Sequence, residues 1–449
     1  MWYRLGQKIL QYRRTSLILL TAMTIFMGYF AVQVKLSYEF TKAIPEDNPT
    51  FAIYKKFVHQ FGVDGTTMVV GFQTKDLYTV RHFNALYDLQ KSIKTIPGVT
   101  EVLGVPSAYA IVKDTINYSF KGNTIFHAPY NNDSALLSDK SVFESLPFYK
   151  HLLYNPDSSS YIMAISFIPD SINSGARSRI INALETKLTT FKKSTQLDVH
   201  VSGLPYIRTI MADRIKKEML WFLIGSLVLS AITLLLFFRS IPAMLMSLAV
   251  VAMGVIWSLG TMVLLGQKIT LLTALIPPLI VVIGIPNCIY FLNKYHTNYI
   301  QSTIEDVNAK KINALIDMVS KMGVVTLFCN ITAAIGFAVF ALTKSTILKE
   351  FGLVAGISIM IIFFISFILL PAVLSYLPAP KAAQTKYLTN KWITTFLLKL
   401  EGWVLNHKKP VYIATAAILA FAVVGIFKLK SVTYIVDDLP KTDKIYTDL

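Results

Sequence analysis

Long apolar runs alternate with polar segments along the chain, and seven of these runs are long enough to cross a membrane. A helix needs about 20 apolar residues to span a hydrocarbon core of about 30 Å. None of the seven runs contains Asp, Glu, Lys, Arg or His, as a medium without water requires. The predicted spans are Leu17–Val34, Met219–Phe238, Pro242–Gly266, Ile269–Leu292, Met322–Thr343, Phe351–Leu374 and Val411–Phe427.

The composition supports the same class. Of the 449 residues, 54% are hydrophobic and 15% are charged, whereas a soluble globular protein carries roughly 25% charged residues. The first run is long for the apolar part of a signal peptide, and no small-residue cleavage site follows it. We therefore predict a multi-pass membrane protein whose first run is a retained anchor.

The net charge of +17 raises the question of nucleic-acid binding. The position of the charges argues against it, because Lys and Arg cluster in alternate connections between spans, as in the positive-inside rule. We therefore predict a cytoplasmic N-terminus, an extracytoplasmic segment after the first span, contact with anionic lipid and no nucleic-acid partner. The clusters are Arg4, Lys8, Arg13 and Arg14, then Lys310, Lys311 and Lys321, then Lys381, Lys386, Lys391, Lys399, Lys408 and Lys409.

Residues 35–218 form one long polar segment, which is enough for a folded domain. Its pattern predicts two β-α-β units and hence an α+β, ferredoxin-like sandwich. Residues 121–150, between the two units, are polar and turn-rich and predict an insertion or flap. The predicted strands are Thr66–Phe72, Val99–Val105, Tyr161–Ile168 and Leu197–Val201, and the predicted helices are Leu77–Ile96, Ala176–Phe191 and the basic Tyr206–Glu218 that leads into the second span.

The fold class predicted for the whole chain is a membrane all-α bundle with an α+β extracytoplasmic domain. The expected boundaries are 1–34 for the cytoplasmic N-terminus and first span, 35–218 for the extracytoplasmic domain, 219–376 for spans two to six, 377–410 for a basic cytoplasmic linker, 411–428 for the seventh span, and 429–449 for the start of a second extracytoplasmic domain.

An internal repeat links the two ends of the chain. Corresponding basic pairs, spans and prolines are separated by a constant 395 residues, which is a recurring plan of transporters with duplicated halves. The matched positions are Arg13-Arg14 with Lys408-Lys409, Lys35 with Lys430, and Pro45 with Pro440. The chain thus resembles one half of a duplicated protein followed by the start of the other half.

The connection before span five has its own pattern. Ile312, Leu315, Ile316 and Val319 share one helical face, and Lys or Asp residues occupy the others. We expect this amphipathic helix to lie at the membrane interface.

No catalytic constellation, phosphate-binding loop or metal-ligand spacing is present, so we expect neither an enzyme nor a cofactor. The two cysteines, Cys288 and Cys329, lie in apolar runs and predict packing residues only. The informative residues are the polar and helix-breaking ones inside the spans, because burying them costs free energy unless they are paired or needed.

Span four places Pro277 and Pro278 near its middle, and Gly284, Pro286 and Asn287 further along. Prolines break the helical hydrogen-bond ladder, and discontinuous helices are where transporters often bind ions and substrates. The alternative is a kinked packing helix in which Asn287 bonds a neighbour, an interaction worth roughly 0.6–2 kcal/mol.

Span five contains Thr326, Asn330 and Thr332, of which the first two share a helical face. We predict a contact between Asn287 and Asn330. The two amides either belong to a transport site or serve as ordinary polar links between helices.

The sequence of these spans resembles that of the RND superfamily, in particular its MMPL/Patched-like branch. The fifth span, VTLFCNITAAIGFAVFAL, is similar to that branch's Thr-rich span with Gly-Phe, and the sixth carries Phe351-Gly352 at its start and Leu370-Pro371 at its end. The resemblance covers essentially the whole chain. It implies that spans two to six form a sterol-sensing-domain-like bundle.

The resemblance further implies proton-driven export of lipids or other hydrophobic molecules from the bacterial inner membrane, by a homo-oligomer or together with further envelope components. The branch holds a relay acid in span four, shortly before an Arg-Tyr or similar pair. Here Lys294-Tyr295 matches the pair, so the place of the acid falls on Pro286, beside Asn287. Neither residue takes up a proton, so either the other half of the duplicated protein supplies the relay, or the coupling ion differs, or this branch does not pump. The alternatives to an exporter are a non-pumping sterol-sensing-type scaffold or receptor, and a SecDF-like export accessory.

Overall fold

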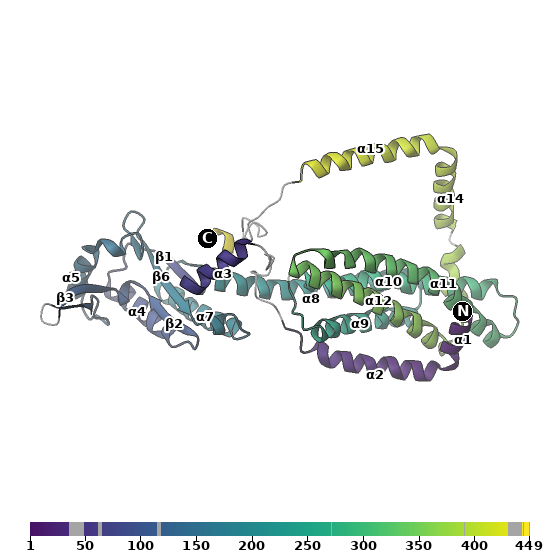
Figure 1. The fold of residues 1–449 in the computed structure, drawn as a ribbon, viewed down its shortest axis with the longest axis horizontal. Helices are drawn as coiled ribbons and strands as arrows, with labels where there is room; N and C mark the ends of the chain where they lie inside the picture. Colours follow the sequence, from purple (N-terminus) through teal and green to yellow (C-terminus); the bar gives the residue numbers. More distant parts are fainter. Residues whose placement is uncertain are drawn as a thin grey trace. The chain divides into compact units, whose positions relative to one another are not determined.

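The computed structural model describes residues 1–35, 49–61, 65–114, 118–270, 272–389, 391–429, 442 and 444–448. The chain divides into two compact units (Figure 1). The helical unit holds the described residues within Met1–Ser37 and Ile215–Val432, and the α/β unit holds those within Glu46–Arg214 and Thr433–Leu449. Lys430, Pro45 and Pro440 of the internal repeat, and most of the predicted start of a second domain, lie outside the described residues.

The α/β unit is built on a five-stranded antiparallel sheet, in which four strands follow the order β2-β6-β1-β7 and the short β5 pairs with β6. Alternate residues of β1 and β6 are buried, which is the period-2 pattern of a sheet with one face on a core. The strands are β1 (Thr67–Gln73), β2 (Val99–Leu103), β3 (Tyr109–Asp114), β4 (Ser119–Thr124), β5 (Tyr154–Asn155), β6 (Ser160–Phe167) and β7 (Val199–Ser202), of which β3 and β4 form a separate hairpin.

Two helices, α4 and α7, connect the strands of this sheet and pack against each other. The α4 helix begins at a Thr79 cap whose side chain accepts from the backbone N–H of His82. The helices of the unit are α3 (Pro49–Phe61), α4 (Val80–Lys94), α5 (Asp133–Glu144), α6 (Pro169–Ile172), α7 (Arg177–Thr195) and α16 (Lys444–Thr447), with the 3-10 turns η2 (Val105–Ser107) and η3 (Pro147–Tyr149). The six predicted strands and helices of the two β-α-β units are each present, with ends shifted by a few residues.

The segment 121–150, predicted as a turn-rich insertion or flap, is ordered and carries part of the core. It contains most of β4, then α5 and η3. Phe126, Leu136 and Phe143 are buried, and Phe126 and Phe143 pack ring to ring at 5.5 Å. The polar composition concealed these apolar residues because they are widely spaced.

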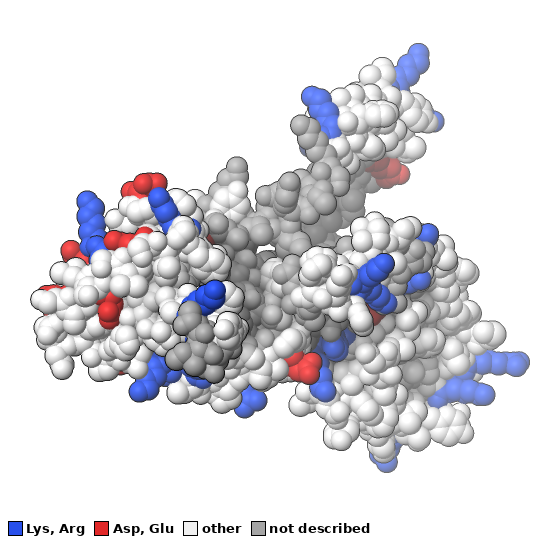
Figure 2. Space-filling model, turned by 60° about the vertical axis from the view of Figure 1, so that its left-hand side comes forward, with Lys and Arg blue, Asp and Glu red and all other residues white. Residues whose placement is uncertain are grey.

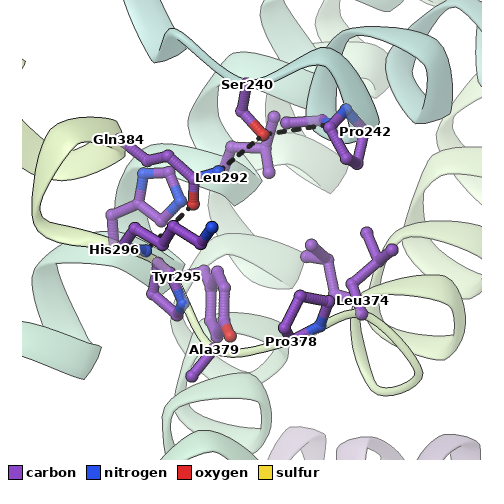
Figure 3. A pocket seen from close by; sticks show the side chains of 13 residues that line it. Ser240, Pro242, Leu292, Tyr295, His296, Leu374, Pro378, Ala379 and Gln384 are labelled. Carbon is purple, nitrogen blue, oxygen red and sulfur yellow. Dashed lines mark hydrogen bonds between the residues drawn. The ribbon is translucent and has the colours of Figure 1, made fainter.

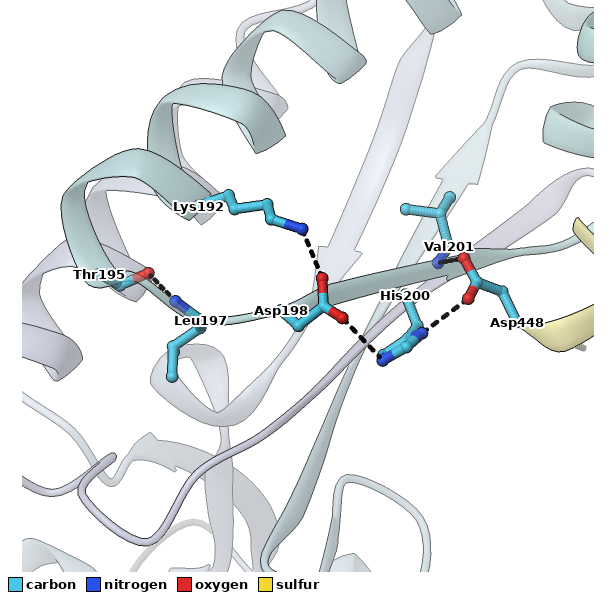
Figure 4. A network of polar contacts seen from close by, with 7 residues as sticks. All are labelled: Lys192, Thr195, Leu197, Asp198, His200, Val201 and Asp448. Atoms are coloured by element: carbon cyan, nitrogen blue, oxygen red, sulfur yellow. Dashed lines mark hydrogen bonds and ion pairs between the residues drawn. The ribbon is translucent and has the colours of Figure 1, made fainter. Parts of the chain in front are cut away.

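The edge strand β7 is covered by a polar network (Figure 4). His200 pairs with Asp448 at 2.6 Å, and Asp198 bonds Lys192. Asp448 also accepts from the backbone N–H of Val201 at 3.4 Å. A carboxylate thus occupies a backbone donor that a free sheet edge would otherwise expose.

In the helical unit, five of the seven candidate spans, α2 and α9 to α12, pack against one another, and all seven predicted runs fall on long apolar helices. Its elements are α1 (Trp2–Gln11), α2 (Arg13–Ala31), α9 (Ile241–Leu264), η4 (Thr273–Leu275), α10 (Ile276–Gln301), α11 (Val307–Ala338), η5 (Val339–Leu342), α12 (Thr346–Leu374), α13 (Ala382–Thr385), η6 (Lys386–Thr389), α14 (Lys391–Asn406) and α15 (Lys408–Phe427). The second span is the end of α8 (Leu204–Phe238), an unbroken helix that begins in the α/β unit.

The surface of the helical unit suits a hydrocarbon environment. The face in view in Figure 2 is largely white, with a few separate groups of Lys and Arg. Large apolar side chains such as Trp221, Phe328 and Phe364 are more than half exposed. Such an exposed apolar area marks contact with lipid or protein rather than with water.

Small residues bring the helices of the bundle together. A Cβ on Gly260 of α9 would lie 2.7 Å from the backbone oxygen of Met27 in α2. A Cβ on Gly352 of α12 would overlap the carbonyl oxygen of Phe337 in α11. Because lipid is as apolar as the side chains, such close backbone approach is a main source of helix association in a membrane.

The amphipathic segment 312–319, expected at the membrane interface, is instead the start of α11 and continues into span five without a break. Leu315, Ile316 and Val319 are buried. Gly6 of α1 allows the approach, because a Cβ there would lie 3.3 Å from Val319 Cβ. The apolar face therefore packs against α1.

The internal repeat extends to the helix ends. The α1 helix ends at Gln11 and α2 begins at Arg13, whereas α14 ends at Asn406 and α15 begins at Lys408. Both pairs of ends are separated by the same 395 residues as the matched basic pairs of the sequence. The break at Tyr12 and the break at His407 thus occupy equivalent positions.

We predict that Gly352→Ala destabilises the bundle by about 1–3 kcal/mol, because the added methyl group meets backbone and cannot be accommodated by a rotamer change. The measurement is thermal unfolding of the full chain in detergent. Gly336→Ala is the matched control, since a Cβ there meets nothing within 4 Å. Equal melting temperatures for the two variants would contradict this packing.

Candidate functional site

The polar residues predicted in spans four and five meet inside the bundle. Asn287 of α10 is 4% exposed and Asn330 of α11 is 2% exposed. Asn287 Nδ2 donates to Asn330 Oδ1 at 3.3 Å, and Asn330 Nδ2 donates back to Asn287 Oδ1 at 3.1 Å. The predicted contact between the two amides is confirmed.

One further residue of α11, Thr326, hydrogen-bonds to the amide pair. Asn330 Nδ2 also donates to the carbonyl oxygen of Thr326 at 2.7 Å, and the Thr326 hydroxyl donates to the carbonyl oxygen of Met322 at 2.6 Å. Both amide oxygens and both nitrogens therefore have partners. A buried polar group that is satisfied in this way links helices at little net cost, and a ligand would have to replace these bonds.

Other predicted site residues surround the pair without joining it. Gly284 lies between α9 and α12, where a Cβ would be 3.1 Å from side-chain atoms of Val251 and Ile362. Pro286 and Thr332 are exposed, and the Thr332 hydroxyl donates to the carbonyl oxygen of Phe328 within its own helix. The structure thus brings together Asn287, Asn330 and Thr326, and leaves Pro286 and Thr332 on the outside of the bundle.

The predicted helix break at Pro277 and Pro278 is wrong in its position. Both prolines lie in the first turn of α10, directly after the turn η4. The first N–H groups of a helix have no intrahelical partner, so proline is tolerated there and pre-sets the backbone angle. Pro286 is the proline inside α10.

A second cluster of polar side chains, which the sequence analysis did not single out, lies at the C-terminal end of α10. Here a small pocket of about 50 Å³ is lined by Tyr295, His296, the N-terminal turn of α9 and the segment after α12 (Figure 3). We name residues 378–387 the strap, because this segment is tied to the start of α9 and to α10. Gln384 donates to the hydroxyl of Ser240 at 3.2 Å. Tyr387 of the strap donates to Asn293 of α10 at 3.1 Å.

Aromatic rings surround this end of the helix. His296 is 3% exposed, and its ring centroid lies 5.8 Å from that of Phe238 and 5.9 Å from that of Tyr387. Burial raises the pKa of Tyr387 above its ordinary value, so its hydroxyl keeps its proton and acts as a donor. The sequence contained a signal for this site: His296 follows the apolar run closely enough to remain on the same helix.

Two basic residues converge on the end of α12 beside the strap. Lys311 of α11 donates to the carbonyl oxygens of Ser375 and Leu377 at 2.7 and 2.6 Å. Arg13 of α2 donates to the Ser375 hydroxyl at 3.1 Å and lies 4.5 Å from the ring of Tyr376. Cations at a helix C-terminus complement its partial negative charge. Two basic clusters of the sequence therefore meet at one end of the bundle.

Comparison with known proteins adds the family. The sequence profile of the MMPL family matches residues 49–403. The chain belongs to the MMPL family. The match includes most of the α/β unit together with α8 to α12, so the family assignment covers both units of the fold.

A relative from Methanocaldococcus jannaschii, named only as a membrane protein, is 23% identical over 367 residues. The alignment covers 80% of this chain and 89% of that protein. MMPL membership and the seven apolar helices together indicate a multi-pass membrane protein of RND transporter type. No group of three or more His, Cys, Asp or Glu suited to a metal ion occurs among the described residues.

We predict that Asn287 and Asn330 are energetically coupled. In a double-mutant cycle with Asn287→Ala and Asn330→Ala, the coupling energy should be about 0.6–2 kcal/mol, as for other hydrogen bonds between membrane helices. The measurement is unfolding of each variant in detergent. Pairing Asn287→Ala with Thr332→Ala gives the control, and a coupling no larger than that of the control pair would show that the reciprocal bond is absent in solution.

Proposed function

We propose that this MMPL-family chain is an exporter of lipids or other hydrophobic molecules in the cytoplasmic membrane. The observation that carries the proposal is the family match, which runs from the α/β unit through the spans. A transporter of this kind needs a domain outside the membrane and a bundle that changes conformation, and the chain has two units that correspond to these needs.

The proposal includes the finer architecture expected from the sequence. The strand order β2-β6-β1-β7, with α4 and α7 as the crossover helices, supports a ferredoxin-like domain. The close packing of α9, α10, α11 and α12 supports a sterol-sensing-domain-like bundle. In this assignment the α/β unit admits the substrate and the bundle supplies the conformational change.

The proposed orientation places the N-terminus and the strap in the cytoplasm and residues 35–218 on the other side. Arg13 and Lys311 support it, because they meet at the end of α12. Lys and Arg close to spans are retained on the cytoplasmic side. The location proposed for the whole protein is accordingly the inner, or cytoplasmic, membrane.

A second candidate is a scaffold or receptor that binds hydrophobic molecules without pumping. It is favoured by the amide pair, since Asn287 and Asn330 satisfy each other and neither exchanges a proton. Under this reading the pair fixes the register of α10 and α11 and takes no part in ion coupling. The two candidates differ in whether a hydrophobic molecule is moved across the bilayer.

We predict that deletion of the gene changes the lipid composition of the outer leaflet or cell surface, and that the purified protein moves a labelled lipid in proteoliposomes under a proton gradient. Asn287→Ala should lower the rate, because the link between α10 and α11 is lost, whereas the exposed Thr332→Ala should leave it unchanged. An unaltered lipid profile combined with no movement in proteoliposomes would favour the scaffold.

A further inference from the structure

His296 has a distinctive position in the helical unit. Among the described Asp, Glu, Lys, Arg and His side chains of that unit, it alone is buried. Imidazole is also the side chain whose charge changes between about pH 5 and 8 in water. The bundle therefore encloses one group whose charge can change near neutral pH once water reaches it.

The hydrogen bonds of the strap fix which nitrogen is free. The Tyr387 hydroxyl donates its proton to Oδ1 of Asn293 at 3.1 Å, so its oxygen accepts from Nδ1–H of His296 at 3.3 Å. With its proton on Nδ1, the neutral imidazole carries a lone pair on Nε2. Nε2 is thus the atom at which the ring can take up a proton.

The pocket gives this ring access to solvent-sized molecules. His296 lines the pocket together with Ser240 and Gln384 (Figure 3). A water molecule needs roughly 10–15 Å³ of such space, and the pocket offers about 50 Å³. Water in the pocket would serve as proton donor to Nε2, and the resulting hydroxide would be neutralised by exchange with bulk buffer.

A charged His296 would be poorly accommodated in the closed pocket. Three titratable groups line the pocket or touch the ring: Tyr295 of the same helix, Tyr387 of the strap and the cationic Lys381 of the strap. The faces contributed by α8 and α9 present Phe238, Ser240, Pro242 and Ala243. No carboxylate lies within 4 Å of the ring nitrogens among the described residues. A buried, unpaired cation is unfavourable, and exposure to water relieves it.

We propose that His296 is the proton-binding site of this bundle, and that protonation of its Nε2 releases the strap from the ends of α9 and α10. The proton adds to the Nε2 lone pair, Nδ1 keeps its proton, and the ring becomes an imidazolium. The strap moves away because Lys381 and the new cation repel each other and because the charge gains hydration. This inference rests on the proposed transport function, to which it adds the coupling ion and the group that carries it.

The site differs from Asn287 in both chemistry and place. Asn287 stands beside the position where the resembling transporters hold an acid, but its amide is occupied by Asn330. His296 lies further along the same helix, at the end where the strap is bound. Proton binding in this chain is therefore assigned to the C-terminal end of α10 rather than to its middle.

The test is amide hydrogen exchange of the full chain in nanodiscs, at about pH 7.5 and about pH 5.5, expressed as protection factors. If only the released state binds the proton, and its exposed imidazole titrates near 6.5, the opening constant rises about tenfold over this range. We expect the protection factors of strap amides to fall about tenfold on acidification, while those of α9 and α12 stay constant.

His296→Gln should abolish this pH dependence, because the amide can donate to Tyr387 but takes up no proton. His407→Gln, which removes an exposed histidine of the same unit, should behave as the wild type. Tyr387→Phe should lower protection at both pH values and keep the dependence. Histidine Cε1–H exchange, read by mass spectrometry on the wild type, checks proton uptake at His296 directly, even if His296→Gln does not fold.

Two results would overturn the proposal: strap protection that does not change with pH in the wild type, or a His296→Gln variant that retains the wild-type change. Neither measurement involves transport. A failure of export with a pH-dependent strap would therefore refute the exporter alone, whereas export with a pH-independent strap would refute His296 alone.

Discussion

The absence of water from a hydrocarbon core is the constraint on which the bundle depends. It removes the hydrophobic effect as a force between helices, because a leucine side chain is no better solvated by another helix than by lipid tails. What remains is close contact and the requirement that every polar group be paired. Gly260 and Gly352 supply the close contact, and the reciprocal bonds of Asn287 and Asn330 satisfy the pairing.

The same constraint explains why charge is confined to the ends of the bundle. At the C-terminal end of α12, Lys311 donates to the carbonyl oxygens of Ser375 and Leu377, which have no partner within the helix, and Arg13 donates to the Ser375 hydroxyl. The strap then follows directly and covers His296. Charge, helix termini and the titratable ring thus occupy one region, while the interior of the bundle carries only neutral polar groups among its described residues.

Sequence reasoning reached the spans and the amide pair because each follows from a local rule. An apolar run must be a helix in a membrane, and two asparagines in adjacent spans can satisfy each other. Sequence reasoning failed where a prediction depended on the exact residue at which a helix begins or ends. The positions of Pro277 and Pro278 depended on where α10 begins, and His296 was overlooked because α10 continues beyond the apolar run to Gln301.

The unbroken α8 has a consequence at the membrane surface. At about 1.5 Å per residue, its 35 residues extend over about 52 Å, whereas the hydrocarbon core measures about 30 Å. About 20 Å of continuous helix must therefore stand outside the hydrocarbon, in the stretch that includes Asp213 and Glu218. A helix satisfies its backbone hydrogen bonds within itself, so this stretch can pass from hydrocarbon through the headgroup layer into water without a partner strand or helix.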